Sequence, residues 1–326
     1  MTQSELANLN NSFGLKSQAK NLLEINCLND LDQLNSVELD NALILGSGTN
    51  VILDKFIDCT VLAIKLHKIS IEEDLVLADA GVAWSDFIEF CLQNNLYGIE
   101  NLTHIPGSVG AAPVQNIGAY GVEISSFIES IFCFNLSSMQ TEILHHDQCE
   151  FGYRDSIFKS KGYIILSVTF KLNKKFLPNL NYPSLNNFLI ESAIDQKTIS
   201  PRVLSDSIRM IRDQRLPNPE IIPNVGSIFK NPVVKTTDYS IDFLAGHRWE
   251  KENNFTKFSA ARLIELIYKD LNVPKSLGFY ENHSLVLINN GNATFDEIIH
   301  LLTEIQDMVY ARFSIHLSTE PEIITS

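Results

Sequence analysis

The chain has 326 residues, 45% of them hydrophobic, so it is long enough for two or three domains with ordinary cores. Acidic residues outnumber basic ones by 39 to 25, and the formal net charge of −14 argues against a nucleic-acid partner, which would need a basic surface. The five cysteines are an odd number without a C-x-x-C pair, which argues against a disulfide framework and a zinc site. We expect reduced thiols and no metal, since no pattern such as H-E-x-x-H is present.

Targeting and membrane segments are not indicated. The first twenty residues lack a charged region followed by an apolar one, and no apolar run reaches the ~18 residues that a membrane helix needs. We therefore expect a cytoplasmic protein without a membrane partner. A monomer is the expected form, although no sequence feature bears on the oligomeric state.

The first third of the chain predicts short strands mixed with a helix. Residues Ala42 to Asp54 predict a buried strand, a glycine turn and a second short strand, and the apolar runs at 60–66 and 75–84 predict two more. Between Ser85 and Asn94, apolar residues recur at spacings of three and four, which predicts a helix. There is no regular alternation of strand and helix, which favours an α+β arrangement.

The middle of the chain predicts two further strands and a helix. The strands are expected at 127–136 and 163–172. Ser200 is the expected N-cap of a helix that starts at Pro201 and runs to about Gln214, with apolar residues along one side. Pro217 ends this pattern and marks an expected domain boundary.

The last third predicts two capped helices. Ser259 is expected to cap a helix whose core residues include Leu263, Leu266 and Ile267. Thr294 and Glu297 have the spacing of a capping box and are expected to open a long helix. Residues 313–326 predict a strand followed by a tail.

Two glycine-containing stretches are typical of close approach to a ligand. Gly46 and Gly48 follow a strand, but Val51 replaces the third glycine of a dinucleotide fingerprint, so the motif is equally consistent with a tight turn and with a phosphate cradle. Residues 101–122 contain four glycines and no Lys, Arg, Asp or Glu, which suits a neutral wall for a flat ring and a diphosphate. A tightly packed, turn-rich segment is the alternative.

Three dispersed polar positions are candidates for chemistry. Arg154 lies in "CEFGYRDSIFK", where its guanidinium is able to grip an anion, although a surface loop with an Arg–Asp pair has the same pattern. Ser227 follows a glycine in "NVGSIFKNP", where a turn hydroxyl is the ordinary interpretation. Glu322 lies in "TEPEII", where exposed carboxylates are the ordinary interpretation.

Taken together, these segments resemble one family. "ILGSGTN", "GIENLTHIPGSVGAAPVQNIGAYGVE", "CEFGYRDSIFK", "NVGSIFKNPVV", "SAARLIE", "HSLVLIN" and "EPE" occur in the order typical of UDP-N-acetylenolpyruvoylglucosamine reductases. The resemblance spans nearly the whole chain. It implies an α+β protein with a two-subdomain FAD-binding fold of the PCMH type, at 1–65 and 66–215. A smaller α+β substrate-binding domain at 216–316 follows, and segment 317–326 is expected to return Glu322 to the active site.

The resemblance also implies a reaction. NADPH reduces FAD, and the reduced flavin reduces the enolpyruvyl ether of a UDP-sugar, UDP-N-acetylglucosamine enolpyruvate, to UDP-N-acetylmuramate for peptidoglycan synthesis. Arg154 is then the cation that stabilises negative charge on the substrate, Ser227 the proton donor and Glu322 an acidic partner.

Binding residues follow from the same resemblance. The residues implied for FAD are Gly46, Ser47, Gly48, Thr49, Asn50, Pro106, Gly107, Ser108, Gly110, Ala111, Gln115, Asn116, Gly118, Ala119 and Gly121. The residues implied for the substrate are Tyr120, Tyr153, Tyr182, Arg212, Arg215, Asn231 and His283. Arg215 and His283 stand where the family commonly has Lys and Gln, so their contacts are expected to differ in geometry.

Two other functions are compatible with these motifs. One is a flavoprotein of the same fold that oxidises alcohol groups; such enzymes often tether the flavin through His or Cys, for which His104 is the nearby residue. The other is a nucleotide-binding relative without catalysis.

Overall fold

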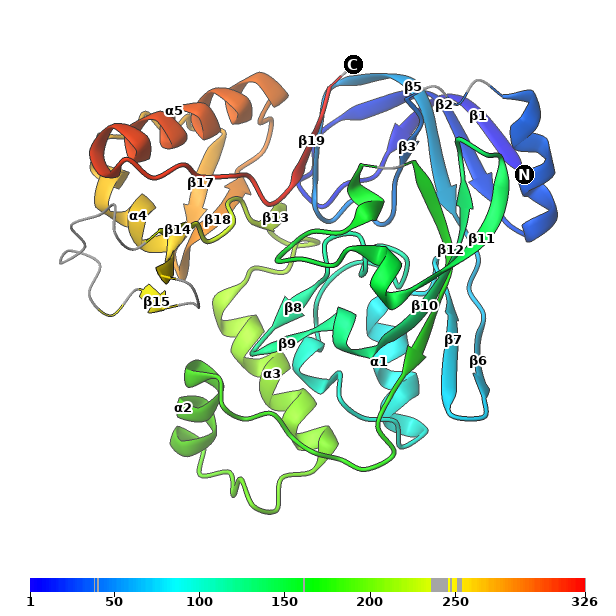
Figure 1. Cartoon of the computed structure of the whole chain (residues 1–326). Helices are drawn as coiled ribbons and strands as arrows, with labels where there is room; N and C mark the ends of the chain where they lie inside the picture. Colours follow the sequence, from blue (N-terminus) through cyan, green and yellow to red (C-terminus); the bar gives the residue numbers. More distant parts are fainter. Residues whose placement is uncertain are drawn as a thin grey trace. The chain divides into compact units, whose positions relative to one another are not determined.

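The computed structural model describes residues 1–37, 39, 41–160, 162–235, 246, 248–250 and 254–325. The chain divides into two compact units (Figure 1). The first combines Met1–Ala7, Ala19–Ser47 and Asp58–Asp213; the second combines Asn8–Gln18, Gly48–Ile57 and Gln214–Ser326. Two short N-terminal segments therefore belong to the same unit as the C-terminal third.

Two sheets organise the N-terminal half. One has the strand order β1-β2-β5-β3, formed by β1 (Thr2–Leu9), β2 (Ser17–Ile25), β5 (Phe56–Ile64) and β3 (Leu43–Ile44). The other has the order β11-β10-β12-β7-β6, formed by β11 (Gln140–His145), β10 (Ile128–Asn135), β12 (Tyr163–Lys171), β7 (Leu75–Asp79) and β6 (Ile69–Glu72). Every pairing in the second sheet is antiparallel.

Helix α1 (Trp84–Gln93) covers a core that the second sheet shares. The rings of Phe87 and Phe170 have centroids 4.5 Å apart, and Trp84 lies 5.4 Å from Phe87. The Trp84 indole donates a hydrogen bond of 2.9 Å to the carbonyl of Leu102, at the start of the uncharged stretch. The core therefore fixes the start of that stretch.

A helical hairpin follows this sheet and has its own apolar cluster. It contains α2 (Pro183–Glu191) and α3 (Pro201–Arg215), packed through Leu185, Leu189, Leu204 and Ile208. The N-terminal end of α3 is held to α1 by paired hydrogen bonds of 2.6 and 2.7 Å from Arg202 to Glu89.

The second unit has helices packed on a small sheet. Strands β13 (Asn224–Ser227), β18 (His283–Asn289) and β17 (Leu277–Tyr280) form the sheet in that order, and α4 (Ala260–Ile267) and α5 (Phe295–Phe313) share its core. The other strands of this unit are β14 (Val233–Lys235), β15 (Arg248–Glu250), β16 (Phe255–Phe258), β4 (Val51–Leu53) and β19 (Glu322–Ile324). In the first unit, β8 (Gly118–Ala119) and β9 (Val122–Glu123) form a separate pair. The N-terminal side chains of Phe13 and Ile52 complete this core.

Most predicted elements are confirmed. The strand–turn–strand at 42–54 becomes β3 and β4, the helix at 85–94 becomes α1, and the strands at 127–136 and 163–172 become β10 and β12. The predicted N-caps are also present: Ser200 Oγ accepts from the Val203 amide at 3.2 Å and Ser259 Oγ from the Arg262 amide at 3.2 Å. Thr294 and Glu297 form the predicted capping box of α5.

The C-terminal prediction was wrong in its order. Residues 314–318 form no regular strand, whereas β19 lies in the expected tail and pairs in parallel with β4. The reason is a partner distant in the sequence, since Glu322 pairs with Val51. Helix α2 was not predicted, because its apolar stripe is short.

None of the described helices combines the length and apolar character needed to cross a membrane. The cysteines are free thiols, and Cys91, Cys133 and Cys149 are buried. Burial raises the pKa of the Cys133 thiol to about 12, so this thiol stays protonated and unreactive at neutral pH.

Glu100 is a buried carboxyl group at the start of the uncharged stretch. One oxygen accepts from the Gly98 amide at 2.9 Å, and the other is buried without a hydrogen-bond partner among the described residues. Burial raises the pKa of Glu100 above its ordinary value.

We therefore expect stability to decline as pH rises from the unfolded pKa of Glu100 through its folded pKa, because the folded state holds the proton more tightly. Glu100→Gln should remove this decline, so in urea unfolding the stability of the variant relative to the parent should increase as pH rises above the ordinary glutamate pKa of 4.5. The exposed Glu129→Gln serves as the control. A constant difference between Glu100→Gln and the parent would contradict the prediction.

Candidate active site

The glycine loop at 46–50 is built from two differently placed glycines. A Cβ on Gly46 would lie 3.5 Å from the Ser108 hydroxyl and from the Ala111 methyl group, so the start of the loop lies against the uncharged stretch. Gly48 has φ +67°, and a Cβ there would lie 2.4 Å from the Asn10 carbonyl. Only glycine satisfies both constraints at position 48.

Residues 106–121 of the uncharged stretch turn repeatedly against the first unit's core. The amides of Val109 and Gly110 donate 2.9 Å bonds to the carbonyls of Val82 and Ala80. These amides hold the stretch against the chain that follows β7. Close packing therefore requires glycine at position 110, because a Cβ there would lie 2.5 Å from the Ala80 methyl group.

Gly110→Ala should consequently destabilise the protein by about 1–3 kcal/mol, the usual range for overpacking. The matched control is Gly152→Ala, where the nearest atom to a new Cβ is 3.7 Å away. Urea unfolding of the two variants measures the difference, and equal stability of both would show that the 80–82 segment yields without strain.

Arg154 lies against the end of this stretch. Its Nη2 donates to the Gly118 carbonyl at 2.6 Å, and its Nη1 donates to the Asn116 carbonyl at 3.5 Å. A Cβ on Gly118 would lie 2.9 Å from Nη1, so the guanidinium needs glycine at this position. The structure thus brings a cation to the neutral wall, from a backbone position with φ +54°.

The neighbours of Arg154 fix this arrangement. Lys159 Nζ donates to the Arg154 carbonyl at 2.7 Å, and the guanidinium lies 5.3 Å from the centre of the Tyr153 ring. The buried Asn116 donates to the Gly152 carbonyl at 3.0 Å and to Glu123 at 3.2 Å. Asn116 therefore joins the uncharged stretch to the segment that carries Arg154.

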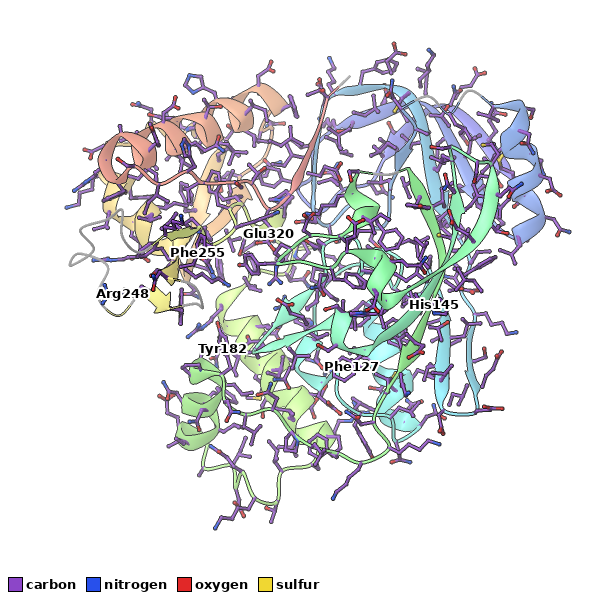
Figure 2. The ribbon with its side chains drawn as sticks, viewed as in Figure 1. Phe127, His145, Tyr182, Arg248, Phe255 and Glu320 are labelled. Atoms are coloured by element: carbon purple, nitrogen blue, oxygen red, sulfur yellow. The ribbon has the colours of Figure 1, made fainter. Side chains whose placement is uncertain are left out.

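Tyr120 and Tyr182 form an edge-to-face pair with centroids 5.5 Å apart. Tyr182 is exposed and comes directly before α2, as Figure 2 shows. The buried Asn101 donates 2.9 Å bonds to the carbonyls of both Tyr120 and Asn179. No sequence pattern indicates these contacts of Asn101, because the two carbonyls lie 19 and 78 residues away in the chain.

Arg212 is directed to the uncharged stretch as well. Its Nε donates to the His104 carbonyl at 3.0 Å, while His104 Nε2 lies 2.8 Å from a carboxylate oxygen of Asp213. Burial lowers the pKa of the Arg212 guanidinium, which still remains charged at neutral pH. Arg212 was predicted to contact the substrate, and its observed contact is with the stretch predicted to hold the cofactor.

In the second unit, Ser227 and Glu322 lie on neighbouring segments. Ser227 ends β13 and pairs with Val286 of β18. The next residue, Ile228, accepts at its carbonyl from the Glu320 amide at 3.0 Å, and the Glu322 amide donates to the Asn50 carbonyl at 3.0 Å. The exposed Glu322, the glycine loop at Asn50 and the strand of Ser227 are thus joined by backbone hydrogen bonds.

The described residues leave space beside Gly226, the residue before Ser227. Gly226 has φ +74°, and a Cβ there would meet no atom of the described residues within 4 Å. Asn231, four residues on, has a structural contact instead: its Oδ1 accepts from the Ala260 amide at 2.9 Å at the start of α4.

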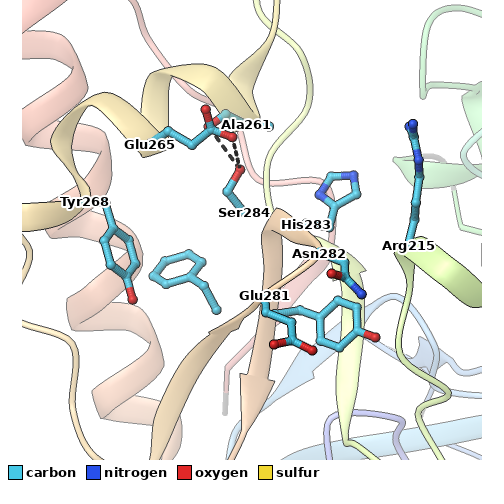
Figure 3. Close-up of a pocket in the computed structure, with 10 residues that line it drawn as sticks. Arg215, Ala261, Glu265, Tyr268, Glu281, Asn282, His283 and Ser284 are labelled. Atoms are coloured by element: carbon cyan, nitrogen blue, oxygen red, sulfur yellow. Dashed lines mark hydrogen bonds between the residues drawn. The ribbon is translucent and has the colours of Figure 1, made fainter. Parts of the chain in front are cut away.

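Arg215 and His283 line one pocket of about 560 Å³ in the second unit (Figure 3). Asn282 donates to the Gln214 carbonyl at 3.0 Å, which ties the turn before His283 to the end of α3. His283 Nδ1 accepts from the Leu285 amide at 3.2 Å, which assigns the proton of the neutral ring to Nε2. Burial and the nearby Arg215 lower the pKa of His283, so the ring is a neutral N–H donor.

The remaining predicted cofactor residues, which lie in the same two loops, are Ser47, Thr49, Pro106, Gly107, Gln115, Ala119 and Gly121. Their chemistry suits FAD, because residues 106–121 include no charged side chain. Gly46 also lies beside the small side chains of Ser108 and Ala111, so the two loops present small groups to a ligand. Among the described residues, no group of three or more His, Cys, Asp or Glu is placed to hold a metal ion.

Known proteins match this chain along its length. Residues 39–134 match the FAD binding domain, and residues 217–324 match the C-terminal domain of UDP-N-acetylenolpyruvoylglucosamine reductase. The reductase of Neisseria gonorrhoeae is 36% identical over 326 residues, covering 95% of this chain and 94% of that protein. That of Flavobacterium johnsoniae is 33% identical over 339 residues, covering 96% of each.

A solved structure supports the fold. The UDP-N-acetylenolpyruvylglucosamine reductase of Thermus caldophilus superposes with a TM-score of 0.69 and 19% identity, covering 99% of this chain and 98% of that one. The predicted α+β fold, an FAD-binding domain of the PCMH type with a further C-terminal domain, is thereby confirmed.

Proposed function

The chain belongs to the UDP-N-acetylenolpyruvoylglucosamine reductase family, and we propose on this basis that it reduces UDP-N-acetylglucosamine enolpyruvate to UDP-N-acetylmuramate. The observation that carries the proposal is identity of 36% across 95% of the chain. FAD is the cofactor and NADPH the reducing co-substrate; when bound and reduced, FAD supplies the hydride to the substrate. The product serves peptidoglycan synthesis.

Arg154 is assigned to stabilise the negative charge that develops on the substrate. Hydride addition to the methylene carbon of an enolpyruvyl ether leaves negative charge that spreads into the carboxylate. The guanidinium is held in place by the carbonyls of Gly118 and Asn116, so it needs little reorganisation when that charge appears. Such preorganised charge stabilises a transition state more than a mobile side chain would.

Ser227 is assigned as the proton donor. A serine hydroxyl is a weak acid, so it is suited to this step only because the acceptor carbon is strongly basic. Two features favour the assignment: the strand pairing to Val286 fixes its backbone, and the neighbouring Gly226 leaves open space among the described residues. Glu322 is assigned as the acidic partner, and the hydrogen bond from its amide to the Asn50 carbonyl holds its backbone beside the glycine loop.

Substrate binding is assigned to both units. Tyr182 and Tyr120 offer an aromatic pair, and Tyr153 lies beside Arg154. Arg215 and neutral His283 offer donors to a diphosphate from one pocket, and Asn231 retains its amide donor. Arg212, whose Nε donates to the His104 carbonyl, is also assigned to the substrate.

The domain roles follow these assignments. We assign FAD binding to subdomains at 1–65 and 66–215, substrate binding to 216–316, and the return of Glu322 to segment 317–326. A cytoplasmic monomer is the form in which we expect the enzyme to act.

Spectroscopy of the purified protein tests the cofactor. We expect a yellow protein whose FAD is released into the supernatant by acid precipitation. Flavin that stays with the precipitate would favour an oxidase with a tethered flavin, and a colourless protein that cannot be reconstituted with FAD would contradict the proposal.

A further inference from the structure

The pocket with Arg215 and His283 contains further polar groups that the assigned chemistry does not use. Its walls include the carboxylate of Glu265, the hydroxyl of Ser284 and the ring of Tyr268. We propose that Glu265 and Ser284 bind the two hydroxyl groups of a ribose, so that the pocket selects a ribonucleoside diphosphate. This inference rests on the proposed function, which supplies a UDP-sugar as the substrate.

The two side chains have spare acceptor capacity. Glu265 Oε2 lies 3.1 Å from Arg262 Nη1, which orients the carboxylate, and Oε1 lies 3.1 Å from Ser284 Oγ. Ser284 Oγ also lies 3.2 Å from the Ala261 carbonyl. A serine has one hydroxyl hydrogen, and both of these neighbours are acceptors, so Oγ is still able to accept from a ligand. Oε1 and Oγ thus form two adjacent acceptors, which match the two donors of a vicinal diol.

Carboxylates are common readers of ribose in nucleotide sites, because an ionised oxygen accepts strongly from a sugar hydroxyl. Arg262 and Glu265 are three residues apart on one face of helix α4. That spacing is typical of an exposed ion pair on a helix, so no sequence pattern marks Glu265 as a ligand-binding residue.

The order of groups along the pocket fits a nucleotide. Tyr268 packs edge-to-face on Phe279 with centroids 5.6 Å apart, and in Figure 3 it lies at the opposite end from Arg215. The dashed contacts of Ser284 and the His283 ring lie between these ends. An aromatic surface suits the base, the acceptor pair suits the ribose, and the Nε2–H of His283 and the guanidinium of Arg215 suit the phosphates.

The test compares UDP with its deoxy analogues. Isothermal titration of the FAD-loaded enzyme should show UDP binding about tenfold more tightly than at least one of 2′-deoxy-UDP and 3′-deoxy-UDP, the scale of a hydrogen bond to a charged group. In Glu265→Gln and in Ser284→Ala this ratio should fall to about threefold or less.

The ratio is the informative quantity, because loss of a negative charge strengthens binding of every anion to the pocket. Glu281→Gln is the matched control: it removes the same charge from the same pocket, and Figure 3 shows its carboxylate directed away from Ser284. This variant should keep the ratio of the parent.

Two results would overturn the ribose assignment while leaving the reductase function intact. They are equal affinities of the parent enzyme for UDP and both analogues, and equal changes of the ratio in Glu265→Gln and Glu281→Gln. Absence of any UDP binding, in enzyme whose flavin is reduced by NADPH, would contradict the proposed substrate itself.

Discussion

Ser227→Ala should leave reduction of the flavin by NADPH nearly unchanged and slow its reoxidation by the enolpyruvyl substrate by ~10²-fold or more. The reason is that the hydroxyl is assigned to protonation of the substrate carbon, a step that NADPH oxidation does not involve. Anaerobic rapid mixing measures the two half-reactions separately, through the bleaching and the return of flavin absorbance.

The control for this variant addresses its fold. Ser227 pairs with Val286 through its backbone, which alanine preserves, so the unfolding transition and the affinity for UDP should stay as in the parent. Ser284→Ala, which removes a hydroxyl from the same unit, should affect UDP binding and leave the protonation step intact. Equal slowing of both half-reactions in Ser227→Ala would refute its assignment as proton donor.

Arg154→Met should slow reoxidation by ~10²–10³-fold, the range for loss of a preorganised group that stabilises developing charge. Arg154→Lys should recover part of this loss, because it restores the charge but not the two-point contact of the guanidinium with the Gly118 and Asn116 carbonyls. Rapid mixing with saturating substrate gives the rate constants.

A second variant separates charge from position. Gly118→Ala keeps Arg154 but places a Cβ 2.9 Å from its Nη1, so the guanidinium must move. We expect slowed reoxidation here too, measured at saturating FAD because Gly118 is itself assigned to the cofactor. Arg209→Met, which removes an arginine paired with Asp206 on α3, is the control and should react like the parent. Parental reoxidation rates in Arg154→Met would show that its cation has no part in the reaction.

Local patterns predicted most elements correctly because their signals lie within one segment. The Ser200, Ser259 and Thr294 caps are examples, since each side chain contacts an amide three residues away. The C-terminal strand was misplaced because β19 is defined by β4, about 270 residues earlier in the chain. Similarly, the assignment of Phe13 and Ile52 to the second unit's core depends on contacts that no local pattern contains.

The candidate site shows the same division. The glycine motifs and Arg154 could be singled out from the sequence, and the structure brings Arg154 to Gly118. By contrast, Asn101, Glu265 and Ser284 lie within the family segments, but no local pattern indicates their contacts, because their partners are brought close only by folding. The orientation of Arg212 toward His104 was likewise beyond a pattern of charges on a helix.

The most direct test of the account is the full redox cycle of the parent enzyme without oxygen. NADPH should bleach the bound flavin, and addition of UDP-N-acetylglucosamine enolpyruvate should restore its absorbance with formation of one UDP-N-acetylmuramate per flavin. A flavin that NADPH bleaches but that this substrate leaves reduced would contradict the account.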